Sequence, residues 1–393
     1  MTAQDSRPLP AAHSRRASIS ITRRGLLRGT FGAAAAVCSA SYAPAVFAQP
    51  RVLRVTQLLD TSPDQQELSR DYSTGIRLAF AEAKQRGLNA PQLATVETDG
   101  TPDALRTALR AIKADATQAA LVGAVGERLA IASVELAHEA KLDIAHVAPW
   151  LADTRHDRDD QVVPLFASRE EQLGHAIRSL ATTGVVELGL VYAGALIGRT
   201  LQAQVGAIAG RLNLRTRSYI APNPNDLAGF GAALAADAPP FLLFLGGSIE
   251  LAQFTQGLSR QKRQRYVICL SDVDTTTLLQ LGPGAGVPLI FTQVVPNAQA
   301  SPAPVVREYR ASLKDLYDEA PSPVSLAGYL AGRYVTRALA GVDAAGGRAA
   351  VLAELRRRRP VDLDGYRLDF AAGMRGSSFV SQTLLGANGR LIG

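Results

Sequence analysis

The feature that most constrains this chain is a regular alternation of short apolar segments with longer stretches of helical period. In the stretch 66–86, for example, Leu68, Tyr72 and Ile76 fall on one helical face, and Gly87 marks the end of the helix. The same alternation recurs along most of the chain after residue 52. Strands separated by helices predict βαβ crossovers, which build parallel sheets covered by helices on both faces.

The apolar segments and helical periods predict the following elements. Strands are expected at 52–59, 92–98, 119–123, 143–148, 188–192, 215–220, 241–245 and 266–270. Helices are expected at 66–86, 102–114, 127–141, 199–212, 226–236, 249–261, 304–318, 325–340 and 348–358. The chain closes with a strand-like piece at 378–385 and a turn at Asn388-Gly389.

Three extended segments, 162–167, 289–295 and 366–370, interrupt this rhythm where one group of βα units gives way to the next. The 345 residues that follow residue 48 exceed a comfortable single-core domain, so we expect two lobes. The predicted fold class is α/β, with two doubly wound lobes of parallel sheet joined by three hinge crossovers. We assign 49–163 plus 296–361 to lobe 1, and 164–295 plus 362–393 to lobe 2.

The N-terminal segment is typical of an export signal. The residues from Thr22 to Arg28, which include the pair Arg23-Arg24, closely resemble a twin-arginine signal. The alanine-rich stretch 25–48 has no acidic residue and ends in Val46-Phe47-Ala48, where a signal peptidase finds small residues. We therefore predict a signal peptide over 1–48, transient contact with the twin-arginine translocase, a mature chain from Gln49 and a periplasmic location. The alternative is a basic disordered tail followed by an alanine-rich helix.

The charge of the whole chain, +7, belongs largely to this segment. Residues 1–48 hold six arginines and one acid, so the rest carries 36 basic and 34 acidic residues, a net charge near +2. That balance removes the main support for nucleic-acid binding. Cys38 leaves with the signal and Cys269 stays alone, so the mature chain has no internal disulfide. Val37 disfavours lipidation of Cys38.

Catalytic and cofactor motifs are absent from the sequence. There is no Gly-x-Ser-x-Gly elbow, phosphate loop or His-Glu-x-x-His, and the histidines lack metal-ligand spacing. The glycines of Gly123–Gly126 could present N–H groups to an anion or simply permit a tight strand-to-helix turn. The run Arg356–Arg359 is favoured as a solvated helix end over a nucleic-acid contact. We predict no catalytic residue, no metal and no cofactor.

Several motifs, taken in order, resemble the Leu/Ile/Val-binding-protein family of periplasmic solute receptors for ABC transporters. The resemblance spans about 52–392. The motifs that carry it are Tyr72-Ser73-Thr74-Gly75 with Ala79-Phe80, Leu121–Gly126, Thr292–Pro296, Ser325–Tyr329 and Gly376–Val380.

The resemblance implies a ligand site between the lobes, beyond the carboxyl ends of the strands. In amino-acid receptors of the family, two hydroxyl-rich loops of lobe 1 hold the zwitterion, and an acid of lobe 2 meets its ammonium. Carried over to this chain, the ligand-binding residues are Gly126, Glu127, Ala148, Trp150, Gly247, Ser248 and Asp272.

Two of these positions depart from the family pattern. Glu127 would repel a carboxylate, and Trp150 offers a ring face in place of a hydroxyl, which suits an aromatic or cationic group. The alternative for Trp150 is packing near the hinge.

The resemblance thus implies a non-enzymatic, monomeric receptor of an ABC transporter. It would close on a small amino-acid-like, aromatic or cationic solute and present it to a membrane permease. A ligand-sensing subunit of a signalling or regulatory system is the alternative, and a hydrolase of this fold class is a more distant one.

Overall fold

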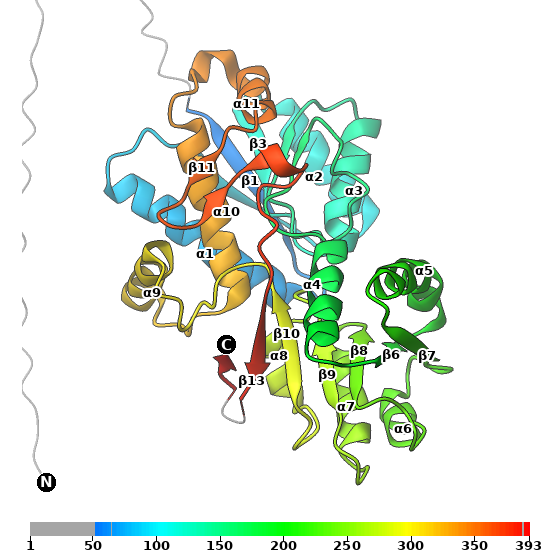
Figure 1. Ribbon diagram of the computed structural model, residues 1–393. Helices are drawn as coiled ribbons and strands as arrows, with labels where there is room; N and C mark the ends of the chain where they lie inside the picture. The colour runs from blue at the N-terminus through cyan, green and yellow to red at the C-terminus, as the bar shows by residue number, and fades with distance from the viewer. Residues whose placement is uncertain (1–51, 64, 387–388) are drawn as a thin grey trace, which may run out of the picture. The chain divides into compact units, whose positions relative to one another are not determined.

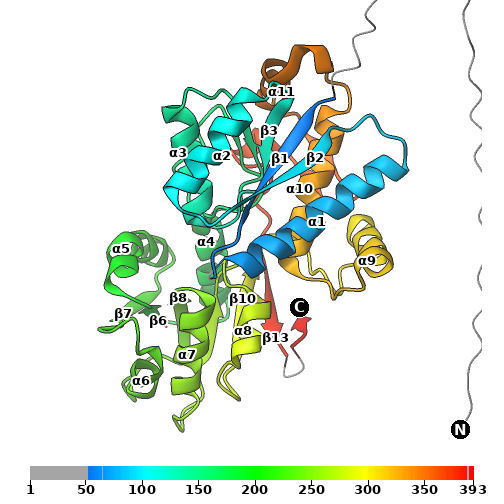
Figure 2. The same cartoon turned by 180° about the vertical axis from the view of Figure 1, so that it is seen from behind.

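The structure is a computed structural model that describes residues 52–393 apart from residues 64, 387 and 388. The predicted signal peptide and Asn388 of the predicted turn lie outside the described residues. The described chain forms two lobes, each a sheet covered by helices on both faces (Figures 1 and 2). A five-stranded sheet in the order β2-β1-β3-β4-β5 defines lobe 1, and a seven-stranded sheet in the order β14-β13-β10-β9-β8-β6-β7 defines lobe 2.

The first half of lobe 1 alternates strands and helices as predicted. Its elements are β1 (Arg54–Asp60), α1 (Gln66–Gln85), β2 (Gln92–Thr98), α2 (Pro102–Ala114), β3 (Gln118–Val122), α3 (Glu127–Glu139), β4 (Ala145–Val147) and β5 (Val162–Val163). The chain returns to this lobe later through α9 (Pro304–Tyr317), α10 (Pro323–Leu339), α11 (Gly347–Arg356), β11 (Val361–Asp362) and β12 (Arg367–Leu368). All pairings within the five-stranded sheet are parallel.

Lobe 2 repeats the same construction. Its elements are α4 (Arg169–Thr182), β6 (Glu187–Tyr192), α5 (Ala195–Arg211), β7 (Arg215–Ile220), α6 (Leu227–Ala232), β8 (Phe241–Leu245), α7 (Ser248–Leu258), β9 (Tyr266–Cys269), α8 (Thr275–Leu281), β10 (Leu289–Gln293), β13 (Ser381–Leu385) and β14 (Leu391–Ile392). The strands from β6 to β10 pair in parallel, whereas β13 and β14 add an antiparallel edge.

Each sheet separates two hydrophobic cores because successive side chains of a strand point to opposite faces. In β8, Leu242 and Phe244 pack into the core under α6, α7 and α8, while Leu243 and Leu245 pack into the core under α4 and α5. The same division applies to β3 of lobe 1, whose five residues are all buried. A strand buried on both faces reads as a continuous apolar run, which explains why these strands were visible in the sequence.

Two of the family motifs turn out to form one helix–helix contact. Helices α1 and α10 cross at Gly75 and Gly328, where an added Cβ would collide with the carbonyl oxygens of Ser325 and Tyr72, respectively. Glycine at these two positions therefore permits the backbones to approach closely. The motifs Tyr72–Gly75 and Ser325–Tyr329 are needed for packing within lobe 1 rather than for ligand contact.

Three crossovers join the lobes, which confirms the predicted fold class. The first runs from β5 to α4, and the second leaves β10 so that Val294 and Val295 pack into the core of lobe 1. The third differs from the prediction. Residues Leu363, Tyr366 and Leu368 are buried in lobe 1, so the last link follows 370 and reaches lobe 2 at β13. Lobe 1 therefore extends to Phe370, nine residues beyond the predicted boundary at 361, because β11 and β12 form a hairpin on its core.

Two helices of lobe 2, α4 and α8, are not among the helices predicted from the sequence. Helix α4 begins with a capping box in which Ser168 and Glu171 satisfy each other's backbone N–H groups, and Asp274 caps α8. No helix in the described part of the chain is long and apolar enough to cross a membrane.

Candidate functional site

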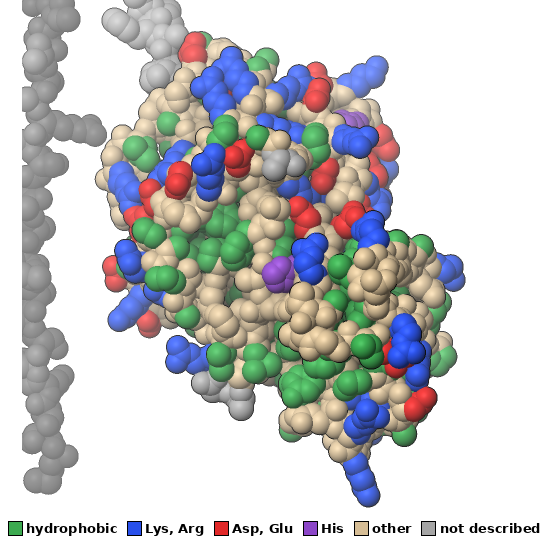
Figure 3. Space-filling view, viewed as in Figure 1, with side chains coloured by type: hydrophobic (Ala, Val, Ile, Leu, Met, Phe, Trp, Pro, Cys, Tyr) green, Lys and Arg blue, Asp and Glu red, His purple; other side chains and the backbone are tan. Residues whose placement is uncertain are grey.

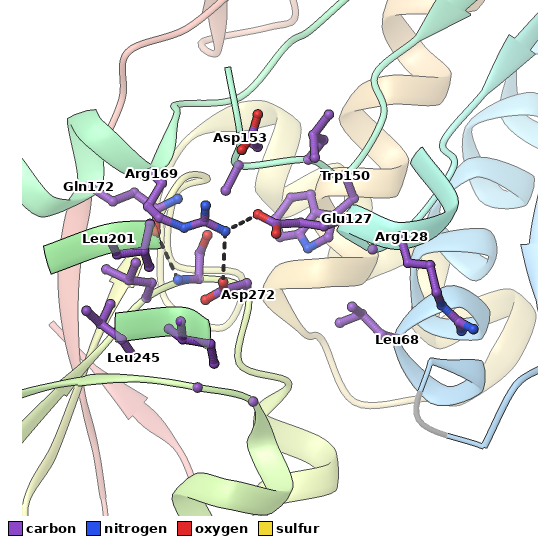
Figure 4. A pocket seen from close by; sticks show the side chains of 18 of the residues that line it. Leu68, Glu127, Arg128, Trp150, Asp153, Arg169, Gln172, Leu201, Leu245 and Asp272 are labelled. Carbon is purple, nitrogen blue, oxygen red and sulfur yellow. Dashed lines mark hydrogen bonds and ion pairs between the residues drawn. The ribbon is translucent and has the colours of Figure 1, made fainter. Parts of the chain in front are cut away.

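A cavity of about 630 Å³ lies between the lobes at the carboxyl ends of their parallel strands. Lobe 1 contributes the turn after β3 and the segment after β4, and lobe 2 contributes the ends of β8 and β9 together with α4 and α5. Both apolar and charged side chains line it. Figure 4 shows that the charged groups from the two lobes face one another.

Six charged residues line the cavity, and three of them form a cluster between the lobes: Glu127 from lobe 1 and Arg169 and Asp272 from lobe 2 (Figure 4). The Nη2 atom of Arg169 forms an ion pair with a carboxylate oxygen of Glu127 and lies 3.8 Å from Oδ2 of Asp272. The side chain of Arg169 is only 11% exposed, whereas those of Glu127 and Asp272 are each 43% exposed. Two accessible carboxylates thus share one guanidinium group.

The surroundings change the pKa values of two of these groups. Burial raises the pKa of the Asp272 carboxyl, Arg169 opposes this effect, and the negative charge of Glu127 adds to it. Burial alone would lower the pKa of Arg169, but the charges of Asp272 and Glu127 raise it overall. With all three groups ionised, the cluster of Glu127, Arg169 and Asp272 carries a net charge of −1. The other two arginines of the lining, Arg128 and Arg155, pair with Asp60 and Asp153.

One part of the lobe 2 wall of the cavity, formed by α5 and the end of β8, is mainly apolar. Leu196, Ile197 and Leu201 of α5 lie beside Leu245 at the end of β8. Leu196 is 70% exposed. Covering such an exposed apolar side chain with a ligand or with the facing lobe removes apolar surface from water, which stabilises the covered state.

Trp150 both lines the cavity and packs within lobe 1, so its predicted contact with a ligand stays a prediction. It reaches the cavity but is only 8% exposed and belongs to the core of lobe 1. Its ring lies 5.8 Å from that of Tyr72 and 5.5 Å from that of Phe166, in tilted and edge-on arrangements. The preceding Pro149 also lines the cavity.

Two other predicted contacts point away from the cavity. Ala148 is fully buried, and its carbonyl oxygen accepts a hydrogen bond of 2.9 Å from the Tyr72 hydroxyl. The hydroxyl oxygen of Ser248 accepts a hydrogen bond of 2.9 Å from the backbone N–H of Asp274. Neither residue lines the cavity, because each is used to hold a neighbouring turn. The structure places Gly126, Glu127, Trp150, Gly247 and Asp272 around the cavity.

The glycine turn after β3 is a tight turn rather than an anion cradle. Gly123 and Gly126 have φ angles of 59° and 87°, which favour glycine. Their backbone N–H groups donate to the carbonyl oxygens of Val147 and Trp150, at 2.9 and 3.3 Å. These donors are therefore already engaged within lobe 1.

Arg169 and Gln172 were not predicted as site residues, because they lie in α4, a helix that was not predicted either. Gln172 is buried, and its Oε1 accepts hydrogen bonds from the N–H of Ser271 (2.9 Å) and the hydroxyl of Thr292 (2.7 Å). It thereby fixes α4 against the ends of β9 and β10. The signal was present in the sequence: Ser168 and Glu171 form the spacing of a capping box before an apolar period.

Arg375, in the third crossover, holds the segment that follows β4. Its guanidinium pairs with the Asp157 carboxylate at 2.8 and 2.9 Å and donates to the carbonyl oxygens of Leu151, Asp153 and Phe166. This side chain is buried, so every one of these contacts lies away from bulk water. The lining of the cavity by Leu151 and Asp153 therefore depends on a residue more than two hundred positions away.

The arginine run at the end of α11 is used within the protein. Basic side chains gather over α11 in Figure 3. Arg357 and Arg359 pair with Glu354, and Arg358 donates to the carbonyl oxygens of Asp157 and Val162. No group of three or more His, Cys, Asp or Glu among the described residues could hold a metal ion.

Comparison with known proteins places this architecture in a family. The family model described as "Periplasmic binding protein" matches residues 53–379. The chain belongs to the periplasmic binding protein family. No curated protein matches the sequence.

Solved structures show that this periplasmic binding protein has the fold of receptors with different ligands. It resembles a possible leucine/isoleucine/valine-binding protein from Rhodopirellula baltica SH 1, with a TM-score of 0.74 and 22% identity over 88% of this chain and 97% of the other. It also resembles a branched-chain amino acid transporter substrate-binding protein from Streptococcus pneumoniae, solved with isoleucine. The TM-score is 0.69 and the identity 13%, over 86% of this chain and 97% of the other. A fatty acid ABC transporter substrate-binding protein from Thermomonospora curvata has a TM-score of 0.69 to this chain. Its identity is 15%, over 86% of this chain and 90% of the other. These likenesses establish the fold and leave the ligand to the site itself.

Proposed function

We propose that this periplasmic binding protein is the solute receptor of an ABC transporter. It would capture a small solute between its lobes, close around it and present the closed form to a permease in the inner membrane, without changing the solute chemically. The observation that carries the proposal is the cavity of about 630 Å³ lined by both lobes, because a ligand that touches both walls stabilises the closed arrangement. The predicted twin-arginine signal would deliver the protein to the periplasm, where we expect it to act as a monomer.

The chemistry of the cavity supports a solute with a cationic group and an apolar body. Arg128 and Arg155 are paired with Asp60 and Asp153. Glu127 and Asp272 share the positive charge of Arg169, so this cluster holds one carboxylate more than it has cations. A cation such as an ammonium group would balance that charge, and an anion would increase the imbalance. The apolar wall around Leu196 and Leu201 suits an aliphatic or aromatic body. Amino-acid-like and aromatic amines both satisfy these conditions.

Thermal stability in the presence of a defined panel of solutes tests the proposal. The mature chain would be melted with L-leucine, L-phenylalanine, phenethylamine and phenylacetate, and any solute retained through gentle purification would be identified by mass spectrometry. A bound solute at a hundredfold excess over its dissociation constant should stabilise the protein by about 2.7 kcal/mol. We expect the amines to stabilise and phenylacetate to have no effect.

Two results would contradict this proposal. Chemical conversion of a bound compound by the purified protein would replace the receptor function with an enzymatic one. Stabilisation by phenylacetate without stabilisation by either phenylalanine or phenethylamine would leave the receptor but reverse the charge of its ligand.

A further inference from the structure

The ion pair between Glu127 and Arg169 connects the two lobes. Glu127 is the first residue of α3, which packs in lobe 1, and Arg169 is the first residue of α4, which packs in lobe 2. Asp272 lies on the other side of the same guanidinium and belongs to lobe 2 (Figure 4). Arg169 therefore lies between one carboxylate from each lobe.

The stability of α4 does not account for an arginine at this position. A positive charge in the first turn of a helix is disfavoured by the helix dipole. The helix already has a complete capping box formed by Ser168 and Glu171, and its first turn holds Glu170 as well. The contacts of Arg169 with Glu127 and Asp272 offset the unfavourable placement, so its position is explained by contacts outside its own helix.

The environment of the pair makes its attraction effective. Arg169 is 11% exposed, and the pKa of its guanidinium is raised by the two carboxylates despite its burial. The partner Glu127 is 43% exposed, so added salt can reach and weaken the pair. Arg169 directly follows the first crossover, and its backbone N–H also donates to the carbonyl oxygen of Ala152 in lobe 1 at 2.9 Å. The backbone contact and the ion pair with Glu127 both join the lobes at this point, so both favour their approach.

We propose that the Glu127–Arg169–Asp272 ion bridge draws the two lobes together in the empty receptor, with Arg169 as the positioning residue. The cleft is then partly closed before a solute enters, and Glu127 acts as an interlobe contact in addition to lining the site. Breaking the bridge shifts the lobes toward an open arrangement. This inference concerns the ligand-free protein, so it holds or fails independently of the receptor proposal.

Pulsed electron paramagnetic resonance between two spin labels measures the interlobe distance without any ligand. The labels would be attached at Arg110→Cys in α2 and Arg199→Cys in α5, which are both exposed and lie in different lobes (Figures 1 and 2). Cys269 is buried and should remain unlabelled. The label pair would be introduced into the otherwise native mature chain and into each variant below.

Glu127→Gln and Arg169→Gln should each raise the ratio of open to closed protein by about two- to fivefold, as expected for a partly exposed ion pair. The double variant should show the same shift as Glu127→Gln, because both lack the interlobe pair. Arg169→Gln should shift at least as far, because it also leaves the carboxylates of Glu127 and Asp272 without their shared cation. Sodium chloride at about 1 M, where the screening length is about 3 Å, should move the native protein toward Glu127→Gln and leave Glu127→Gln unchanged.

Arg155→Gln is the matched control. Arg155 also lines the cavity, but it pairs with Asp153 of the same lobe, so its loss should leave the distances unchanged. Distance distributions of Glu127→Gln and Arg169→Gln that coincide with the native one at low salt would overturn the proposal. Shifts of the two variants that add in the double variant would overturn it as well.

Discussion

Replacing Trp150 with alanine should destabilise lobe 1 by about 3–5 kcal/mol, the usual cost of removing a large aromatic side chain from a packed interior. The indole is 8% exposed and makes ring contacts with Tyr72 and Phe166 at 5.8 and 5.5 Å. For a domain of this size, each kcal/mol corresponds to about 2–4 °C in melting temperature, so we expect a decrease of roughly 10 °C.

Circular dichroism of the ligand-free mature chain measures this decrease. Trp150 is the only tryptophan, so the fluorescence of the native protein also reports the unfolding of lobe 1 alone. Trp150→Phe is the matched control, because it retains an aromatic ring between Tyr72 and Phe166 and should lose clearly less stability than the alanine variant. Melting of lobe 2 should not change in either variant.

The opposite pattern would refute this reasoning. If Trp150→Ala melts at the native temperature and instead loses affinity for a solute that stabilises the native protein, the ring is a wall of the binding site and not part of the core. The sequence alone left these two roles open.

Three further predictions follow from the site, from a buried histidine and from the export signal. Asp272→Asn should weaken binding of a cationic solute by about ten- to a hundredfold, because it removes a charge-assisted hydrogen bond that contributes about 1.5–3 kcal/mol. Calorimetry with any amine that stabilises the native protein measures this loss. Unchanged affinity would remove Asp272 from the site. Burial lowers the pKa of His146 to about 3, so the unfolded chain binds a proton that the folded chain does not, and stability should fall by up to about 1.4 kcal/mol per pH unit as the pH drops from 6.5 towards 3. Urea unfolding at several pH values should show a shallower fall for His146→Leu, and equal slopes would contradict this account. Replacing Arg23 and Arg24 with lysine should retain the precursor in the cytoplasm, and N-terminal sequencing of exported native protein should begin at Gln49; undiminished export of the lysine variant would exclude the twin-arginine pathway.

Local patterns in the sequence were sufficient for most of the fold. The helix Pro102–Ala114 and the strands Gln92–Thr98, Arg215–Ile220 and Phe241–Leu245 have the bounds that their patterns predict. These patterns are reliable because the spacing of apolar residues reflects which face of a helix or strand is buried. That spacing can be read from residues that are close together in the chain. The two missed helices show the limit: α8 is short, and α4 was marked mainly by its cap.

For the site, the sequence could predict which loops lie near the cavity, but not which side chains point into it. Parallel strands bring the turns after β3, β4, β8 and β9 to one edge. Gly126, Glu127, Gly247 and Asp272, which the family resemblance assigned to the ligand site, line the cavity at that edge. Side-chain direction does not follow from the topology. Ala148 and Ser248 lie in the expected turns but point into hydrogen bonds within their own lobes.

The order of the elements follows from periodicity along the chain. The two lobes follow from the chain length and from the three segments that interrupt the rhythm, and the edge at which the loops meet follows from the parallel topology. The tertiary structure alone decided that Trp150 is buried between Tyr72 and Phe166, and that Arg169 lies between Glu127 and Asp272. Both outcomes depend on contacts between residues far apart in the chain. Burial and ion pairing are properties of the assembled neighbourhood, so no local pattern around Trp150 or Arg169 could contain them.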